Sequence, residues 1–336
     1  MSSAPLVRLE GLRKYFPARG GWLRGKRMWV RAVDDVSFDV VAGETLGLVG
    51  ESGCGKSTLA RCIVRLTEPT AGRLEFAGED ITHRSMRELK PLRRDVQLIF
   101  QDPLTSLNPR KRVRQILGDA LAIRHPGAGR SALDIEAESL LRRVGLPSQF
   151  MERLPRELSG GQRQRVGIAR AVAVGPKLIV ADEPVSALDV SVQADILNLI
   201  KDLQAEFGLT IVFISHDLGV IRHVSDRVGV MYLGRLVEMA PSEIFYAAPL
   251  HPYSEALLSA IPTPDPDARL IRNEIVLKGD VPNPLSPPRG CRFHTRCPYA
   301  REICAAVEPR LTAASGGAER LVACHFPLRQ EESSPH

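Results

Sequence analysis

The sequence predicts an α/β fold in which helices cover a mostly parallel sheet. Apolar strands alternate with amphipathic helices from Leu6 to about Tyr246, which is the pattern of a parallel sheet with crossover helices. The longest apolar runs, KLIVA and TIVFIS, have the length of buried strands. A glycine-rich loop separates a third such strand from a helical pattern at residues 45–66.

The composition is that of a globular protein. The 336 residues suffice for one large domain and a small one, or for two modest domains. Apolar residues make up 44% and charged residues 25%. With 45 basic and 39 acidic residues the net charge is +6, which does not by itself indicate nucleic-acid binding. Anionic lipid head groups or a nucleotide suit this charge equally well.

The chain is expected to be cytosolic or peripheral to a membrane. The N-terminal MSSAPLVRLEGLRKYF has no apolar run long enough for a signal peptide. Nowhere do about 18 apolar residues run together, so no bilayer-spanning segment is predicted. Disulfides are not expected in such a protein, where clustered cysteines more often indicate metal binding or chemistry.

The composition changes at about Pro249. The segments PLHPY, IPTPDPD and DVPNPLSPPRG are rich in proline, which prevents continuous helix or central strand. This part is predicted to be an irregular, semi-rigid connection to a small tail domain. The last residues, QEESSPH, are predicted to be disordered.

The phosphate-binding loop is the strongest motif. Residues Gly50 to Ser57 match G-x-x-x-x-G-K-S between the strand Thr45–Val49 and a helix. The loop glycines let successive N–H groups turn toward phosphate oxygens, and the helix N-terminus adds unpaired donors. Lysine here reaches the β- and γ-phosphates, and the serine hydroxyl binds Mg²⁺. The alternative is a glycine-rich turn without a ligand. The ATP-binding residues expected here are Gly50, Glu51, Ser52, Gly53, Cys54, Gly55, Lys56, Ser57 and Thr58.

A second motif supplies two carboxylates. In KLIVADEP, an apolar strand over Lys177–Ala181 ends in Asp182 and Glu183. Adjacent residues on a strand point to opposite faces, but the chain turns at the strand's end, so that both can approach the nucleotide. Asp182 is expected to hold Mg²⁺ through water, and Glu183 to polarise the water that attacks the γ-phosphate. By itself the pair would also fit two solvated acids in a turn.

The stretch ELSGGQRQRVGIARAV lies between these motifs. Its LSGGQ, Leu158 to Gln162, resembles the signature of ATP-binding cassette (ABC) ATPases. A helix is expected from about Arg163 to Val174, with Ser159, Gly160 and Gly161 as a second anion cradle at its N-terminus. One compact domain cannot grip a single ATP from both sides. We therefore expect two domains packed head to tail, with Ser159, Gly160, Gly161 and Gln162 facing the partner's ATP. The resemblance adds Asp189 to this group.

Other positions resemble the ABC family one by one. The resemblance implies that Gln101 in LIFQDP contacts Mg²⁺ and senses the membrane partner. It implies that Asp189 in SALD touches the opposite subunit and that His216 contacts the γ-phosphate. It makes Phe16 in RKYF, with Tyr15 as the alternative, the ring that stacks on adenine. Each residue alone has a simpler explanation, as a structural histidine, a core aromatic ring or a solvated glutamine. No motif position is degenerate, so the site is expected to hydrolyse ATP with Glu183, His216 and Gln101, and to bind magnesium through Ser57, Gln101 and Asp182.

The resemblance extends over about residues 5 to 328. GESGCGKST, QDPLTSLNPR, HPYSEALLSAIP and the tail GDVPNPLSPPRGCRFHTRCPYA are similar to ATPase subunits of dipeptide and oligopeptide importers. The insert PARGGWLRGKRMWVRAV after Phe16 resembles their DppF or OppF type. This resemblance implies a P-loop NTPase fold with an ATPase domain over residues 5–260, whose helical subdomain at about 102–158 couples to the membrane partner near Gln101. A C-terminal extension follows over residues 261–330.

The resemblance also implies an assembly and a reaction. The chain would hydrolyse ATP to power import of dipeptides or oligopeptides, with the solute chosen by other subunits. Its partners would be a second, homologous ATPase in a head-to-tail heterodimer, two membrane permeases and, indirectly, a solute-binding protein, with no nucleic acid. It would lie on the cytoplasmic side of the inner membrane. The alternatives are a regulatory ATPase and an ABC-type ATPase acting on nucleic acid. The latter usually carries two cassettes or long coiled coils, whereas this chain has one cassette and no sustained heptads.

Four of the six cysteines gather near the C-terminus. Five, six and nineteen residues separate Cys291, Cys297, Cys304 and Cys324, which is wider than the usual spacing of zinc or plant-type iron–sulfur sites. Four thiolates in a short proline-rich tail with a poor core indicate a metal staple. The family resemblance implies a [4Fe–4S] cluster on these cysteines. Zinc, with His294 or His325 replacing a thiolate, and four unligated thiols are the alternatives. No metal role is assigned to Cys54 or Cys62, and Cys54 is expected to be open to oxidation.

Overall fold

An eight-stranded sheet forms the centre of the computed structural model, which describes residues 4–23, 26–102, 106–261, 275–314 and 319–328. The strand order is β11-β12-β10-β9-β3-β8-β7-β6. Strands β9 to β6 run parallel, and the remaining pairs are antiparallel. The prediction of a mostly parallel sheet is therefore confirmed. The strands are β3 (Thr45–Val49), β6 (Val96–Ile99), β7 (Leu178–Asp182), β8 (Thr210–Ile214), β9 (Arg227–Tyr232), β10 (Arg235–Pro241), β11 (Thr312–Ala313) and β12 (Leu321–Val322).

A second, four-stranded antiparallel sheet has the order β2-β1-β4-β5. The sequence patterns did not predict it, because its pairing depends on contacts between distant segments rather than on local periodicity. The insert after Phe16 forms the far end of the β1–β2 hairpin, where Trp22 pairs with Arg27. The strands are β1 (Val7–Leu23), β2 (Lys26–Val40), β4 (Ala71–Phe76) and β5 (Glu79–Asp80).

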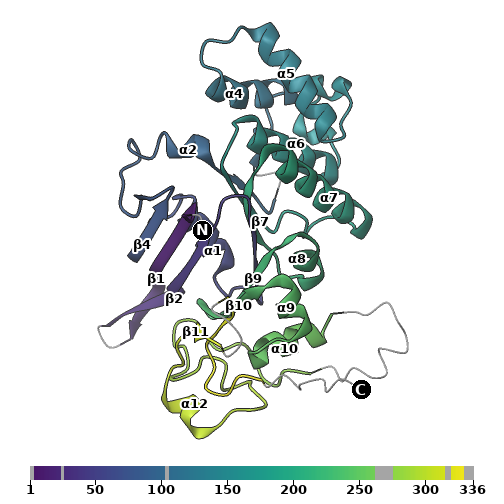
Figure 1. Cartoon of the computed structure of the whole chain (residues 1–336). Coiled ribbons are helices and arrows are strands. Elements are labelled where there is room, and N and C mark those ends of the chain that lie inside the picture. The colour runs from purple at the N-terminus through teal and green to yellow at the C-terminus, as the bar shows by residue number, and fades with distance from the viewer. Residues whose placement is uncertain (1–3, 24–25, 103–105, 262–274, 315–318, 329–336) are drawn as a thin grey trace, which may run out of the picture.

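Helices cover the central sheet and extend from one end of it. Figure 1 shows α4 and α5 at the opposite end of the molecule from α12 and the C-terminal extension. Among the described residues no helix is long and apolar enough to cross a membrane. The helices are α1 (Lys56–Ile63), α2 (Leu92–Asp95), α4 (Val113–Arg124), α5 (Arg130–Arg143), α6 (Gly160–Ala173), α7 (Val190–Phe207), α8 (Leu218–Val224), α9 (Ser242–Ala247), α10 (Pro252–Ser259) and α12 (Glu302–Ala306), with 3₁₀ turns η1 (Ser148–Glu152) and η2 (Pro155–Glu157).

The core has two parts, one on each face of the central sheet. Along β7, Leu178 and Val180 join the cluster shared with the antiparallel sheet and α1. Ile179 and Ala181 point the other way, into the cluster formed with helices α4 to α10. Successive side chains of a strand face opposite sides, so a strand covered on both faces must be continuously apolar. This explains why KLIVA and TIVFIS have no polar alternation.

The C-terminal extension packs on the ATPase domain. Its β12 pairs with β10, so that Val322 lies opposite Glu238. Phe293 is 1% exposed and meets the ring of Tyr232 edge-on at 5.3 Å. The pattern of prolines predicted an irregular tail, and most of the described extension is irregular. It did not predict that the tail returns to the edge of the sheet, because two-residue strands leave no periodic signal.

A buried ion pair also fixes the extension. Arg292 donates hydrogen bonds to the carboxylate of Asp34 and to the carbonyl oxygen of Leu233, and both charged side chains are almost fully buried. Burial raises the pKa of the Asp34 carboxyl, but hydrogen bonds from Tyr15 and Arg292 outweigh it and hold this pKa below its ordinary value. The extension is therefore joined to β2 by charge as well as by apolar packing.

Candidate functional site

The phosphate loop connects β3 to α1 and has room only for glycine at key positions. Gly55 is the N-cap of α1 with φ 108°, a conformation that favours glycine. A Cβ at this residue would lie 2.0 Å from the carbonyl oxygen of Ala32, and one at Gly50 would lie 2.2 Å from that of Met231. The loop thus packs against the neighbouring backbone. Two of its N–H groups are engaged within the protein, that of Glu51 with the Tyr253 hydroxyl and that of Cys54 with the Glu51 carbonyl oxygen, so an anion would be bound by the N–H groups at the start of α1.

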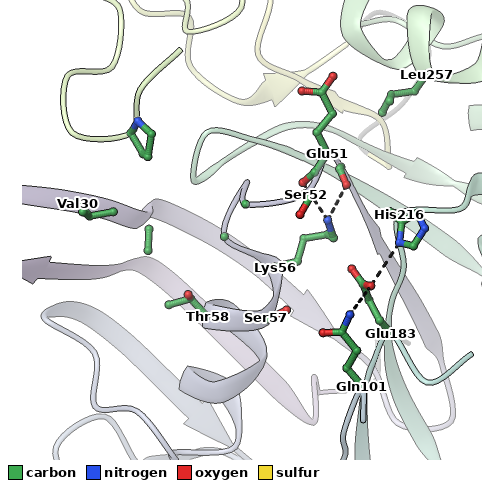
Figure 2. A pocket seen from close by; sticks show the side chains of 15 residues that line it. Val30, Glu51, Ser52, Lys56, Ser57, Thr58, Gln101, Glu183, His216 and Leu257 are labelled. Carbon is green, nitrogen blue, oxygen red and sulfur yellow. Dashed lines mark hydrogen bonds and ion pairs between the residues drawn. The ribbon is translucent and has the colours of Figure 1, made fainter. Parts of the chain in front are cut away.

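A pocket of about 600 Å³ opens over this loop (Figure 2). Lys56 lies buried within it, and its ammonium donates to the carbonyl oxygens of Gly50 at 2.5 Å and Glu51 at 3.1 Å. A triphosphate would take over these donors. The pocket is lined by Val30, Ala32, Gly50, Glu51, Ser52, Gly53, Gly55, Lys56, Ser57, Thr58, Gln101, Glu183, His216, Leu257 and Pro284. The motifs did not predict Val30, Ala32, Leu257 or Pro284, because their position depends only on how distant segments pack.

The two residues expected to bind magnesium from the loop and from β7 lie together. Ser57 Oγ donates to Asp182 Oδ1 at 2.8 Å. Asp182 is 5% exposed, and burial raises the pKa of its carboxyl, an effect that the Ser57 hydrogen bond partly offsets. A buried carboxylate without a cation is unfavourable, so this pair is suited to a hard cation such as Mg²⁺.

Two side chains predicted to be catalytic contact the carboxylate of Glu183. Gln101 Nε2 donates to Glu183 Oε2 at 3.1 Å, and His216 Nδ1 lies 3.3 Å from the same oxygen (Figure 2). The backbone of Glu183 has φ 48°, in the left-handed region, and its N–H donates to the carbonyl oxygen of Ile214 at 3.0 Å. This turn at the end of β7 lets Asp182 and Glu183 both face the pocket region although they are adjacent in sequence.

The signature segment forms a second helix N-terminus. Ser159 caps α6: its Oγ accepts the N–H of Gln162 at 3.3 Å, and its own N–H donates to Gln162 Oε1 at 2.9 Å. The helix begins at Gly160 rather than at about Arg163, so the expected start was wrong. Gly160 and Gly161 thus belong to the first turn, where a Cβ at Gly161 would lie 2.6 Å from Val192.

This segment does not join the nucleotide pocket of its own chain. None of Ser159, Gly160, Gly161, Gln162 and Asp189 lines that pocket. Ser159, Gly160 and Asp189 are exposed, and Val190 beside Asp189 is 82% exposed. The predicted phosphate contacts therefore fall into two separate groups in one chain.

The two candidate adenine-stacking rings differ in their surroundings. Tyr15 donates its hydroxyl to Asp34, and the Arg31 guanidinium lies 6.0 Å from its ring. Phe16 is 38% exposed and pairs across the hairpin with Val30, which lines the pocket. Lys14 Nζ lies 5.0 Å from the centre of the Phe16 ring. Phe16 is thus the more exposed of the two rings, and its cross-strand partner lines the pocket.

The four C-terminal cysteines line one small cavity together with His251, His294 and His325. Cys304 is buried and the other three are half-buried. Burial raises the pKa of the Cys291 and Cys324 thiols to about 11. In the described part of the chain, no group of three or more His, Cys, Asp or Glu side chains is arranged to hold a metal ion. The metal staple therefore stays a prediction.

The remaining two cysteines are buried. Cys54 is 5% exposed, with Sγ 3.7 Å from Lys56 Nζ, and burial raises the pKa of its thiol. Cys62 is fully buried, and burial raises its pKa to about 11. The expectation that Cys54 is open to oxidation was wrong, since a buried, protonated thiol is inert.

Two family models match the chain. The model described as "ABC transporter" matches residues 33–186. The model described as "Oligopeptide/dipeptide transporter, C-terminal region" matches residues 237–304.

Two relatives match almost end to end. The chain is 51% identical over 322 residues to the oligopeptide transport ATP-binding protein AppF of Bacillus subtilis (strain 168), covering 96% of this chain and 97% of that protein. It is 53% identical over 325 residues to the probable peptide ABC transporter ATP-binding protein y4tS of Sinorhizobium fredii (strain NBRC 101917 / NGR234), covering 97% and 90%.

A solved structure has the same fold. It is the dimeric ATP-binding cassette MJ0796 in a post-hydrolysis state, bound to ADP and Pi. Its chain superposes with a TM-score of 0.64 at 30% identity, covering 70% of this chain and 98% of that one.

Proposed function

This chain belongs to the ABC transporter family of ATP-binding proteins, and from that premise we propose that it is the ATP-hydrolysing subunit that powers an importer of dipeptides and oligopeptides. The observation that supports this best is the convergence of Gln101 and His216 on Glu183, next to a phosphate loop whose Ser57 contacts Asp182. Positioning and charge neutralisation would carry the reaction, without a covalent intermediate.

Each residue has a proposed part in hydrolysis. Lys56 binds the β- and γ-phosphates, and Ser57 with Asp182 holds Mg²⁺. Glu183 accepts a proton from the attacking water, and Gln101 and His216 orient this carboxylate and the γ-phosphate. Ser159 and Asp189 of a partner cassette complete the site from the other side, which is why they are exposed in the single chain. The cassettes therefore form a head-to-tail dimer, and we propose that the partner is a second, homologous ATPase subunit.

The membrane partners would be two permeases on whose cytoplasmic face the chain lies, with a solute-binding protein upstream. We propose that the helical segment at about 102–158, with α4 and α5, contacts them. The test is co-expression with the candidate permeases and reconstitution in lipid vesicles. We expect co-purification and an ATPase rate that rises when the binding protein and peptide are added. Stimulation by DNA or RNA instead of by peptide would contradict the proposal.

We further propose that the four-cysteine cavity holds a [4Fe–4S] cluster bound by Cys291, Cys297, Cys304 and Cys324. Four thiols are the ligand number of such a cluster. The ring of His251 is 1% exposed and lines the same cavity, and its Nε2 has no hydrogen-bond partner. Its Nδ1 accepts the N–H of Tyr253 at 3.0 Å, so Nε2 carries the proton. An orphaned N–H would suit a sulfur acceptor, and this supports the proposal, although the described His, Cys, Asp and Glu side chains are not arranged to hold a metal ion.

Zinc is the alternative metal for this cavity. His294 Nδ1 contacts the carbonyl oxygen of Cys291 at 2.8 Å, and His325 Nε2 contacts that of Val307 at 2.9 Å, so each keeps one ring nitrogen for a metal. Iron, acid-labile sulfide and zinc would be measured on anaerobically purified protein, together with the visible absorption spectrum. We expect about four iron and four sulfide per chain. Zinc without iron would favour the alternative, and absence of all three would contradict a metal staple.

A further inference from the structure

Glu51, the second residue of the phosphate loop, is held by the C-terminal extension. Arg296 Nη1 donates to its Oε2 at 2.8 Å and to its Oε1 at 3.1 Å, across 245 residues of sequence. The Arg296 side chain is 9% exposed and that of Glu51 is 26% exposed. An ion pair this sheltered is screened much less by solvent than one on the surface.

The backbone of Glu51 is held as well. Its N–H donates to the hydroxyl of Tyr253 at 2.9 Å, and its carbonyl oxygen accepts from Lys56 Nζ at 3.1 Å. Tyr253 is fully buried and packs 4.7 Å from the ring of Tyr232 and 5.3 Å from that of Phe293. A displacement of the Glu51 backbone would therefore move a carbonyl oxygen that accepts a hydrogen bond from Lys56.

The PLHPY segment connects this contact to the sheet. Glu238 on β10 is fully buried, and its carboxylate accepts the N–H groups of Leu250 and His251 at 2.8 Å each. These bonds fix the start of α10, whose first turn carries Tyr253. The proline-rich segment thus has a defined position relative to the loop, and a fixed acceptor for the Glu51 N–H.

Charge explains why the pair would affect the nucleotide. Glu51 lines the pocket that the triphosphate would occupy, and a free carboxylate there would repel phosphate oxygens. Arg296 neutralises this carboxylate from the side of the extension and does not itself line the pocket. Removing Arg296 alone would leave an uncompensated, half-buried negative charge beside the phosphates, whereas removing both charges would not.

We propose that Arg296 is a positioning residue of the ATP site, which neutralises and orients Glu51 so that the C-terminal extension sets the affinity of its own chain for ATP. This inference rests on the proposed function, because it assumes that the pocket binds ATP. It predicts an effect on nucleotide affinity rather than on the chemical step.

The test uses the full-length chain with its partner cassette and compares Arg296→Met with the double variant Glu51→Gln/Arg296→Met. Equilibrium binding of Mg-ATP and the KM and kcat of hydrolysis are measured for each. We expect Arg296→Met to weaken ATP binding and raise KM about tenfold, with kcat at saturating ATP changed less than about threefold. Adding Glu51→Gln should recover most of the lost affinity, because no unpaired charge remains.

Two further variants make the test specific. Arg296→Lys keeps the charge and should bind ATP nearly as well as the natural chain, with a loss of about threefold because the lysine side chain is shorter and holds the Glu51 carboxylate less firmly. Arg310, an exposed arginine of the same extension, provides the matched control, and Arg310→Met should leave affinity unchanged. If Arg296→Met does not fold, Arg296→Gln, which retains a polar donor, is measured in its place.

The outcomes separate this inference from the proposed function. Unchanged affinity in Arg296→Met would overturn the inference, and so would a loss that Glu51→Gln does not recover, since that pattern indicates only general damage to packing. A natural chain that neither binds nor hydrolyses ATP would instead overturn the proposed function.

Discussion

The phosphate loop and the signature segment are two similar local structures with different surroundings. Both place glycines at the N-terminus of a helix, α1 in one case and α6 in the other. The first lies in a pocket that contains the buried Lys56. Beside it, Ser57 is hydrogen-bonded to Asp182, and Glu183 contacts both Gln101 and His216. The second is capped by its own Ser159 and lies exposed. The comparison teaches that a helix N-terminus supplies donors, whereas its surroundings decide whether one chain can complete a site.

The largest loss of ATP turnover is expected from substitution of Glu183, which belongs to the pocket group of this comparison. Glu183→Gln keeps the shape of the side chain but removes the proton acceptor, so turnover should fall about 10³-fold while ATP still binds. Single-turnover hydrolysis and nucleotide binding on the same preparation would check this. Lys56→Ala is the contrasting variant, for which binding itself should be lost. Unchanged turnover in Glu183→Gln would remove this residue from the proposed mechanism.

The next largest effect is expected at Ser159, in the exposed signature segment. Ser159→Arg places a long side chain where the partner's ATP would dock, so hydrolysis should fall about a hundredfold. Binding of ATP to the phosphate loop of the same chain should persist, because Ser159 does not line that pocket. ATPase rates and ATP-dependent dimerisation, measured by sedimentation, would test this. If Ser159→Arg hydrolysed ATP at the normal rate, the two groups would not belong to one composite site.

A smaller effect is expected from the influence of pH on magnesium binding by the buried carboxylate of Asp182. Burial raises the pKa of Asp182, so its carboxylate takes up a proton at a higher pH than an ordinary aspartate. Mg²⁺ competes with this proton, so the magnesium dependence of ATP binding should weaken as pH falls through the raised pKa, by about tenfold per pH unit below it.

The check is a titration of Mg-ATP binding against pH, with magnesium-free ATP as the reference. Asp182→Asn should abolish the difference between the two curves. A difference that is the same at every pH would show that the Asp182 carboxylate does not hold the ion.

The smallest effect is expected at the pocket mouth. Phe16→Ala removes a stacking ring worth about 1 kcal/mol, so the Kd for ATP should rise about fivefold with kcat little changed. Tyr15→Phe is the matched comparison, because it keeps a ring but removes the hydroxyl bonded to Asp34. An unchanged Kd in Phe16→Ala would contradict the assignment of Phe16 as the stacking ring, whereas weaker binding in Tyr15→Phe would report only the loss of the hydroxyl bonded to Asp34.

Local patterns were sufficient for much of the site. The strand Thr45–Val49 has the predicted bounds, since an apolar run that ends at a glycine loop leaves little choice. The strand KLIVA is displaced by one residue and ends at Asp182. The end of β7 brings Glu183 toward Gln101 and His216, whose roles were implied by the resemblance to the ABC family rather than by a local pattern.

Other features had no local signal. The antiparallel sheet depends on pairing between segments far apart in sequence, such as Val7 with Phe76. The start of α6 was misplaced because glycines favour loops in general, whereas here the Ser159 cap and close packing against Val192 place them in a helix. The bond from Arg296 to Glu51 joins residues that no motif relates.

The sequence by itself determined which groups this protein has for handling a nucleotide, because a glycine loop, a lysine and strand-ending acids act through local geometry that a short stretch can encode. Only the tertiary structure decided where the C-terminal extension lies and which loop residue it contacts. That outcome depends on the burial of Phe293, Arg292 and Tyr253 against partners far along the chain. Burial is a property of the whole packed molecule, and no window of sequence contains both sides of such a contact.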